Sequence, residues 1–125
     1  MQGVIETADF LADAADTGMS EEERALIVLA LSENPKLGDL MPGTGGARKV
    51  RFASPGKGKR GGYRVIHYYG GEDIPVFLLA VLKKGERADL SQAEKNELRK
   101  ELAGLKQDYL AAIRTKAREA RRSRR

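Results

Sequence analysis

Residues 47–69 read ARKVRFASPGKGKRGGYRVIHYY, and this stretch decides how the chain folds. Residues 48–53 alternate in character, with Val50 and Phe52 on one side of an expected strand and bases on the other. Alternation resumes in residues 63–69. The segment between them holds one proline and four glycines, which exclude regular structure. The stretch therefore predicts a β-hairpin with a glycine-rich loop.

The hairpin carries seven basic residues and no acidic one, namely Arg48, Lys49, Arg51, Lys57, Lys59, Arg60 and Arg64. Residues 40–71 thus have a net charge of +7, whereas the whole chain has +5. Residues 1–39 hold nine acids and two bases, and residues 114–125 hold seven bases and one acid. This uneven distribution predicts a defined polyanion-binding face at the hairpin rather than a uniformly basic surface.

The chain before the hairpin predicts a strand and two helices. Residues 4–7 are expected to form a short strand, and residues 8–16 a helix. Ser20 and Glu23 have the spacing of a capping box, which predicts that a second helix starts there. Residues 36–46 are rich in glycine and contain a proline, so we expect a turn-rich connector. Its glycines are not followed by the Lys-Ser/Thr pair that a phosphate-binding loop requires.

The chain after the hairpin predicts a buried strand and one long helix. Residues 76–82 are nearly all apolar, as expected for a central strand, so that three successive strands form an antiparallel meander. Ser91 and Glu94 form a second capping box. The apolar stripe of the helix that follows is Leu98, Leu102, Leu105 and Tyr109.

These elements predict a single α+β domain over residues 1–113: a small antiparallel sheet with two N-terminal helices packed on one face and a C-terminal helix. Residues 114–125 are expected to be a basic tail that is frayed or disordered, because like charges repel.

Composition narrows the possible chemistry. The chain has no cysteine and one histidine, which excludes disulfides, thiol catalysis, zinc fingers and multi-histidine metal sites. We therefore expect no cofactor. The longest apolar runs are too short to cross a membrane, and acids occupy the positions where a signal peptide would need positive charge, so we expect a cytoplasmic protein. Alternation puts His67 on the side opposite Arg64, and we expect it in the core.

Clustered Lys and Arg side chains suit RNA cleavage without metal. In that reaction the 2′-hydroxyl of the RNA attacks the adjacent phosphate, and cations stabilise the charge that develops there. Guanidinium groups match phosphate oxygens, and a lysine among other cations has a lowered pKa. The residues alone leave two alternatives open, which are cleavage of RNA and binding of RNA without cleavage.

Three segments resemble the RelE/HigB group of toxins from bacterial type II toxin-antitoxin modules, within the RelE/ParE superfamily. They are Gly43–Arg51 (GTGGARKVR), Gly56–Ile66 (GKGKRGGYRVI) and Lys84–Ser91 (KGERADLS). The resemblance implies a RelE-like α+β domain. It also implies a toxin that cleaves messenger RNA on the ribosome and thereby inhibits translation.

The resemblance also implies roles for single residues. Proton transfer, phosphate contact and transition-state stabilisation are expected from Lys57, Lys59, Arg64 and Lys84. On the basis of charge and, for Tyr68, of base stacking, RNA binding is expected from Arg48, Lys49, Arg51, Arg60, Tyr68 and Arg87. Lys84-Gly85 stands where some members have an arginine, and no tyrosine occurs near Leu90-Ser91, where they have a catalytic tyrosine. The general acid is therefore not assigned.

The implied partners are messenger RNA, the ribosome and a cognate antitoxin. The antitoxin is expected to be HigA-like with a helix-turn-helix domain, and operator DNA is expected to be contacted only through it. Two other functions remain as alternatives: a noncatalytic RNA- or ribosome-binding module, and a ParE-like inhibitor of DNA gyrase.

Overall fold

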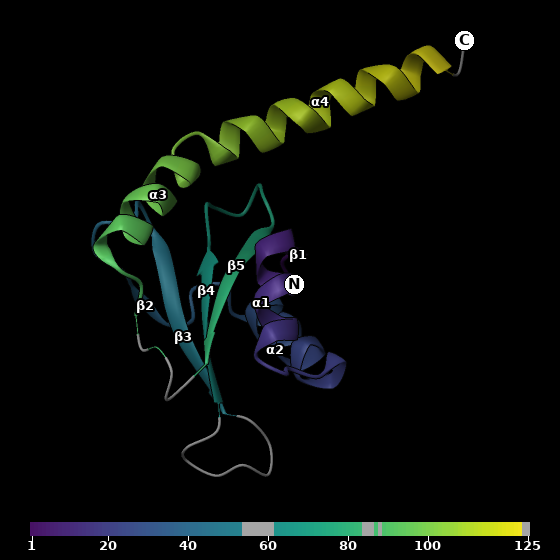
Figure 1. Cartoon of the computed structure of the whole chain (residues 1–125). Helices are drawn as coiled ribbons and strands as arrows, with labels where there is room; N and C mark the ends of the chain where they lie inside the picture. Colours follow the sequence, from purple (N-terminus) through teal and green to yellow (C-terminus); the bar gives the residue numbers. More distant parts are fainter. Residues whose placement is uncertain (54–61, 84–86, 88, 124–125) are drawn as a thin grey trace.

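The computed structural model describes residues 1–53, 62–83, 87 and 89–123. Its elements follow in the order β1 (Val4–Glu6), α1 (Ala8–Asp16), α2 (Glu21–Glu33), β2 (Asp39–Leu40), β3 (Ala47–Ala53), β4 (Gly62–Tyr68), β5 (Val76–Lys83), α3 (Gln92–Leu102) and α4 (Leu105–Ser123). The strands form one sheet in the order β1-β5-β4-β3-β2 (Figure 1). All neighbours are antiparallel except β1 and β5, which are parallel. The predicted α+β class is confirmed.

The sheet has a separate apolar core on each face. On one face, α1 and α2 contribute Phe10, Ile27 and Leu31, which pack against Val65 and Leu78 of the sheet. On the other face, α3 packs Leu98 and Leu102 against strand residues such as Ile66 and Leu82. Figure 1 shows α1 and α2 on one side of the sheet and α3 on the other. The predicted placement of the two N-terminal helices on one face is therefore confirmed.

Both predicted capping boxes are present. The Ser20 side chain accepts a hydrogen bond from the Glu23 amide, and the Glu23 carboxylate accepts one from the Ser20 amide. Ser91 and Glu94 make the same reciprocal pair at the start of α3. Each box satisfies backbone N–H groups that the first turn of a helix leaves without partners.

The predicted single C-terminal helix is wrong in one respect, because it is broken into α3 and α4. Ala103 has an extended backbone conformation, and Gly104 has a φ of +88°, which glycine adopts at little cost. The helix resumes as α4, which extends beyond the rest of the domain (Figure 1). Residues 105–123 thus form one helix, and fraying of the tail in solution stays a prediction.

The outer edge of β5 is only partly covered by β1, and α1 protects the remainder. β1 pairs with Val76, Phe77 and Leu78 only. Further along β5, the Asp13 carboxylate of α1 accepts a hydrogen bond from the Val81 amide at 3.0 Å. An otherwise open strand edge is thereby capped by a side chain, which prevents pairing with another strand.

Candidate functional site

Two neighbouring strands present basic side chains on one face of the sheet. Arg51 of β3 lies directly opposite Arg64 of β4, and Lys49 lies opposite Ile66. Residues paired across two strands have Cβ atoms about 5 Å apart, and positions two residues apart along a strand are about 7 Å apart. Because Ile66 belongs to the core under α3, these cations lie on the α3 side of the sheet. Lys49, Arg51 and Arg64 are called the basic face below.

Arg64 is the member of the basic face best placed to bind an anion. Its side chain is half-buried, and in the described part of the chain no hydrogen bond or ion pair engages it. Arg51 presents a second guanidinium directly across the strand pair. A phosphate group bound at Arg64 would match the two-pronged donor geometry of a guanidinium.

Asp89, an acidic residue beside the basic face, is held in ion pairs with two lysines. The Asp89 carboxylate lies 3.4 Å from Lys49 Nζ and 3.2 Å from Lys95 Nζ. Burial opposes ionisation of Asp89, but the Leu90 amide and the two lysines outweigh it and lower the pKa of this carboxyl. Asp89 is therefore ionised at neutral pH and cannot donate a proton.

Arg87 is engaged at the start of α3. Its guanidinium donates to both oxygens of Glu94 and also to the Asp89 carbonyl. The hydrogen bonds from Arg87 lower the pKa of Glu94 to about 2, and the Ser91 amide adds to the effect. Glu94 is thus a second carboxylate that stays ionised, which excludes it as a general acid at neutral pH.

A groove of about 580 Å³ runs along β5 between α1 and α3. Its floor and walls are largely apolar, and they include Phe77, Leu79, Ala80, Leu90, Leu98, Leu102 and Leu105. Leu79 faces the groove because β5 has one residue more than β4 at this point: Ile66 pairs with Ala80, whereas His67 pairs with Leu78. We call this feature the acidic groove, because five carboxylates line it: Asp9, Asp13, Glu94, Glu97 and Glu101.

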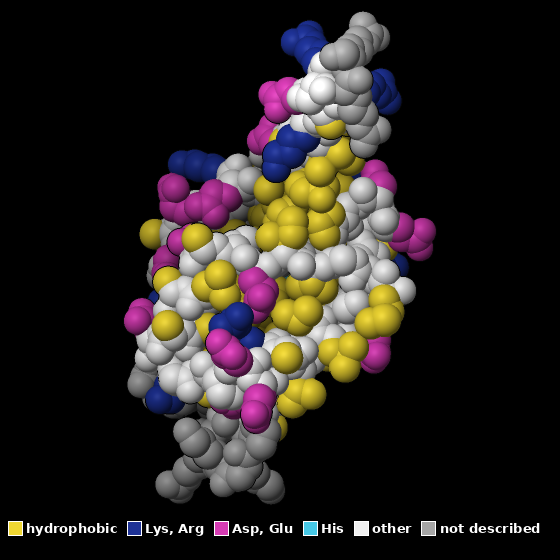
Figure 2. Space-filling view, turned by 90° about the vertical axis from the view of Figure 1, so that its right-hand side faces the viewer, with side chains coloured by type: hydrophobic (Ala, Val, Ile, Leu, Met, Phe, Trp, Pro, Cys, Tyr) yellow, Lys and Arg dark blue, Asp and Glu magenta, His cyan; other side chains and the backbone are white. Residues whose placement is uncertain are grey.

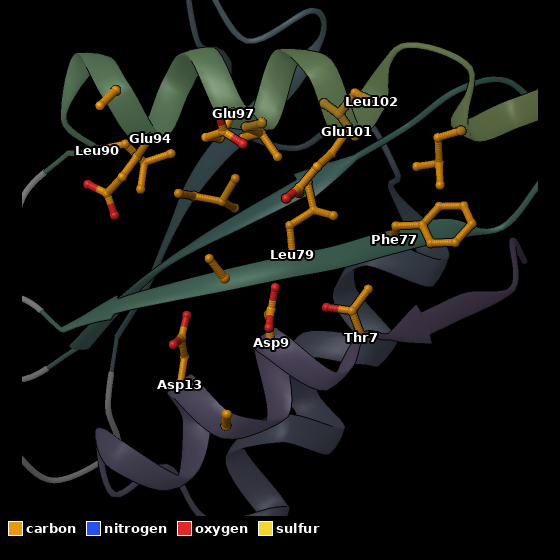
Figure 3. A pocket seen from close by; sticks show the side chains of 16 residues that line it. Thr7, Asp9, Asp13, Phe77, Leu79, Leu90, Glu94, Glu97, Glu101 and Leu102 are labelled. Carbon is orange, nitrogen blue, oxygen red and sulfur yellow. The ribbon is translucent and has the colours of Figure 1, made fainter.

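Figure 3 shows how these carboxylates are arranged. Asp9 and Asp13 rise from α1, while Glu94 and Glu101 reach toward β5 from α3. In the space-filling view of this side, hydrophobic side chains gather below the protruding end of α4 and acidic side chains border them (Figure 2). The acidic groove repels RNA, and its combination of apolar floor and anionic rim suits a cationic amphipathic segment of protein.

A comparison with protein families identifies the chain. Residues 38–120 match the family model described as the RelE toxin of the RelE/RelB toxin-antitoxin system. The chain belongs to the RelE toxin family. It is thus the toxin of a toxin-antitoxin system, and a cognate antitoxin is its expected partner. The match covers β2 to α4, which includes the basic face and one wall of the acidic groove.

This RelE-family chain brings together only part of the predicted site. Lys49, Arg51 and Arg64 form the basic face, and Tyr68 lies on the same side, packed against the core under α3. Tyr68 is four residues from Arg64, or about 13 Å along the strand, which suits stacking on a base better than contact with the reacting phosphate. The predictions for Lys57, Lys59, Arg60 and Lys84 lie outside the described residues.

Arg48 lies on the other face of the sheet from the basic face of the toxin. It pairs with His67, and its guanidinium donates to the carbonyls of Lys36 at 3.2 Å and Gly38 at 3.3 Å. Arg48 thus holds the connector before β2 against β3. Its predicted role in RNA binding stays a prediction, but it does not belong to the basic face.

The prediction of a core position for His67 is confirmed. The side chain is fully buried, and its Nε2 atom lies 2.8 Å from the Leu37 carbonyl. Among the residues that the structure describes, no group of three or more His, Asp or Glu side chains is arranged to hold a metal ion. Over the same residues, no helix has the length and apolar character needed to cross a membrane.

The sequence interpretation missed the acidic groove. Its carboxylates come from α1 and α3, which are about 80 residues apart in the chain. Helical spacing offered a partial signal, since Asp9 and Asp13 are four residues apart and Glu94, Glu97 and Glu101 follow at intervals of three and four. That spacing predicts one acidic side on each helix, but not that the two sides face each other.

Proposed function

We propose that this toxin is a ribosome-dependent endoribonuclease that cleaves messenger RNA without a metal ion and inhibits translation. The observation that supports the proposal most strongly is the pair of arginines directly opposed on one sheet face, with the Arg64 guanidinium engaged by no described residue. RelE-family toxins are typically ribonucleases, and this supports the proposal that the chain cleaves RNA.

In the proposed reaction, the 2′-hydroxyl of one nucleotide attacks the adjacent phosphorus and the 5′-oxygen of the next nucleotide leaves. The products carry a 2′,3′-cyclic phosphate and a 5′-hydroxyl. Arg64, with Arg51 across the strand pair, stabilises the negative charge that develops on the phosphate oxygens. Lys57, Lys59 and Lys84 are proposed for proton transfer and phosphate contact. Lys49, Arg60, Arg87 and Tyr68 are proposed to bind the flanking RNA.

The ionised state of two nearby carboxylates limits the choice of proton donor. Because Asp89 and Glu94 have lowered pKa values, neither supplies the proton for the leaving oxygen. A cationic donor fits the residues at hand, because a lysine among several cations has a pKa shifted toward the useful range. We propose that one of Lys57, Lys59 and Lys84 has this role.

Expression of the toxin without its antitoxin tests the activity. We expect growth arrest and cleavage of translated messages, with 2′,3′-cyclic phosphate ends at the new 3′ termini, and cleavage by the purified toxin on ribosomes in the presence of EDTA. Intact messages on ribosomes would contradict the proposal. Binding with a steep salt dependence but without cleavage would favour a noncatalytic module, and inhibition of supercoiling would favour a gyrase inhibitor.

We propose that the antitoxin occupies the acidic groove with a cationic amphipathic helix. The argument is charge complementarity: a helix with apolar residues on one side and Lys or Arg at its flanks would bury the leucines of the floor and face the acidic rim, where Asp9, Glu97 and Glu101 are not committed to Arg87 or to the β5 edge. The antitoxin itself is proposed to be HigA-like with a helix-turn-helix domain, and to contact operator DNA on behalf of the complex.

Reversal of two charges in the groove should weaken the complex with the antitoxin. In the double variant Glu97→Lys/Glu101→Lys, lysines would face the cationic helix, and like charges placed together across an interface cost several kcal/mol. We expect a loss of affinity of at least about tenfold in a titration of the purified proteins. The control Glu33→Lys/Glu72→Lys changes the net charge equally at exposed sites outside the groove. Equal affinities of the two variants would contradict this docking site.

A further inference from the structure

Only the first turns of α4 are attached to the domain. Lys106 Nζ lies 3.0 Å from an Asp73 carboxylate oxygen, and the Tyr109 ring meets Phe77 edge to face with centroids 5.7 Å apart. From Ala111 to Ser123 every residue is exposed. Figure 1 shows this half of α4 extending away from the sheet and from the hairpin that carries the basic face.

The exposed half of α4 has its arginines on one side. At about 100° per residue, positions 114, 118, 121 and 122 fall within an arc of about 100°, and they span about 12 Å along the axis. We call these four residues the arginine stripe: Arg114, Arg118, Arg121 and Arg122. In the described part of the chain, no ion pair or side-chain hydrogen bond engages their guanidinium groups. Glu119 is the only acid between residues 109 and 125.

Such a helix needs a counter-charge. Like charges at i and i+4, as in Arg114 with Arg118 and Arg118 with Arg122, destabilise a helix. A helical segment of about ten residues without tertiary contacts is also marginal in water. Anions bound along the arginine stripe would offset both costs.

The side chains of this segment favour a nucleic acid over a protein as the partner. A helix that docks on a protein anchors itself with large apolar side chains, but beyond Ile113 the apolar residues are only Ala117 and Ala120. The acidic groove of a second copy would therefore gain little from this half of α4. Arginine outnumbers lysine four to one here, and the guanidinium fork matches phosphate oxygens with two hydrogen bonds.

We propose that the arginine stripe is a second RNA-binding surface, which contacts the phosphates of double-stranded RNA and is separate from the basic face. The choice of RNA rather than DNA rests on the proposed function, in which the toxin acts on the ribosome. The stripe anchors the toxin to structured RNA, while the basic face acts on the single-stranded message. Its contacts are to phosphates, so the anchoring is independent of sequence.

Salt-dependent binding of a fluorescent 20-base-pair RNA duplex by the full chain tests the proposal. Each phosphate contact contributes about 0.7 to 0.9 to the slope of log affinity against log salt. The quadruple variant Arg114→Gln/Arg118→Gln/Arg121→Gln/Arg122→Gln should therefore lose about three from this slope and bind at least about tenfold more weakly. Glutamine keeps good helix propensity, and circular dichroism verifies that α4 still forms.

A matched pair of double variants separates the stripe from net charge. Arg118→Gln/Arg122→Gln and Arg99→Gln/Lys100→Gln each remove two charges, but Arg99 and Lys100 are exposed on α3 rather than on the stripe. We expect only the first to lower the slope, by about 1.5. Equal slopes in the two would overturn the proposal. Tighter binding of a DNA duplex of the same sequence, or loss of antitoxin affinity in the quadruple variant without loss of RNA affinity, would overturn it as well.

Failure of the proposed function gives a different result. If the wild-type toxin cuts no message on ribosomes while the stripe variants still lose duplex binding, the ribonuclease proposal fails and the stripe stands. If messages are cut but duplex binding is insensitive to the stripe, only the present inference fails.

Discussion

Replacement of Arg64 by alanine is expected to lower the rate constant of RNA cleavage by about 10²–10³-fold, the usual cost of losing one group that stabilises a developing oxyanion. Arg64 is fixed on β4 by strand pairs on both sides, to Arg51 of β3 and to Leu82 of β5. Its backbone position therefore does not depend on a loop.

Single-turnover cleavage under saturating toxin measures this effect, because it separates the chemical step from binding. Arg64→Lys retains the charge but not the guanidinium fork, and an intermediate rate is expected. Arg99→Ala, an exposed arginine of α3, serves as the control for loss of one positive charge. A cleavage rate of Arg64→Ala equal to that of Arg99→Ala would remove Arg64 from the mechanism.

The sequence predicted the faces of the hairpin well because strand alternation is a local property. Val50 and Val65 lie in or against the core under α1 and α2, and Arg51 and Arg64 lie together on the other side, as alternation requires. The two capping boxes were predictable for the same reason, since each depends on residues three positions apart.

Long-range features were not predictable from local patterns. The two-residue strand β2 lies in the connector that was predicted as turns, and it forms because Asp39 and Leu40 find partners on β3. The break at Gly104 was missed, because the apolar stripe continues across it to Leu105 and Tyr109. Arg48 was assigned to RNA binding by its charge, although its position in the alternation matches that of Val50 rather than Lys49.

The acidic groove shows most clearly why the site was only partly predictable. A charge count finds the excess of acids in residues 1–39 but does not locate a partner for them. Only the packing of α1 on one side of β5 and α3 on the other brings two acidic helix sides to face each other. The basic face was predictable because it lies within one hairpin, and the groove was not because it joins distant segments.

The stability of the toxin is expected to fall as the pH falls below about 6.5, because of His67. The Nε2 atom donates to the Leu37 carbonyl, so the neutral ring carries its proton there, and Nδ1 has no hydrogen-bond partner in the described structure. Burial lowers the pKa of His67, the Leu37 carbonyl opposes this shift, and the positive charge of Arg48 adds to it. A second proton would therefore be buried without an acceptor, next to a guanidinium.

The sign of the effect follows from proton binding. Well above pH 6.5 His67 is neutral in both the folded and the unfolded chain, and it contributes nothing to the dependence of stability on pH. Below this value the unfolded chain binds a proton that the folded chain excludes, so the free energy of unfolding falls by up to about 1.4 kcal/mol per pH unit until the folded pKa is reached.

Urea unfolding between pH 7.5 and 5.0 measures this slope, and the variant His67→Gln identifies its source. Glutamine can still donate to the Leu37 carbonyl but does not titrate, and the chain has no other histidine. We expect the dependence on pH to flatten in the variant, with the two curves converging toward acid pH. A variant that keeps the full wild-type slope would show that another group is responsible, because the protonation of His67 would then contribute nothing to the loss of stability.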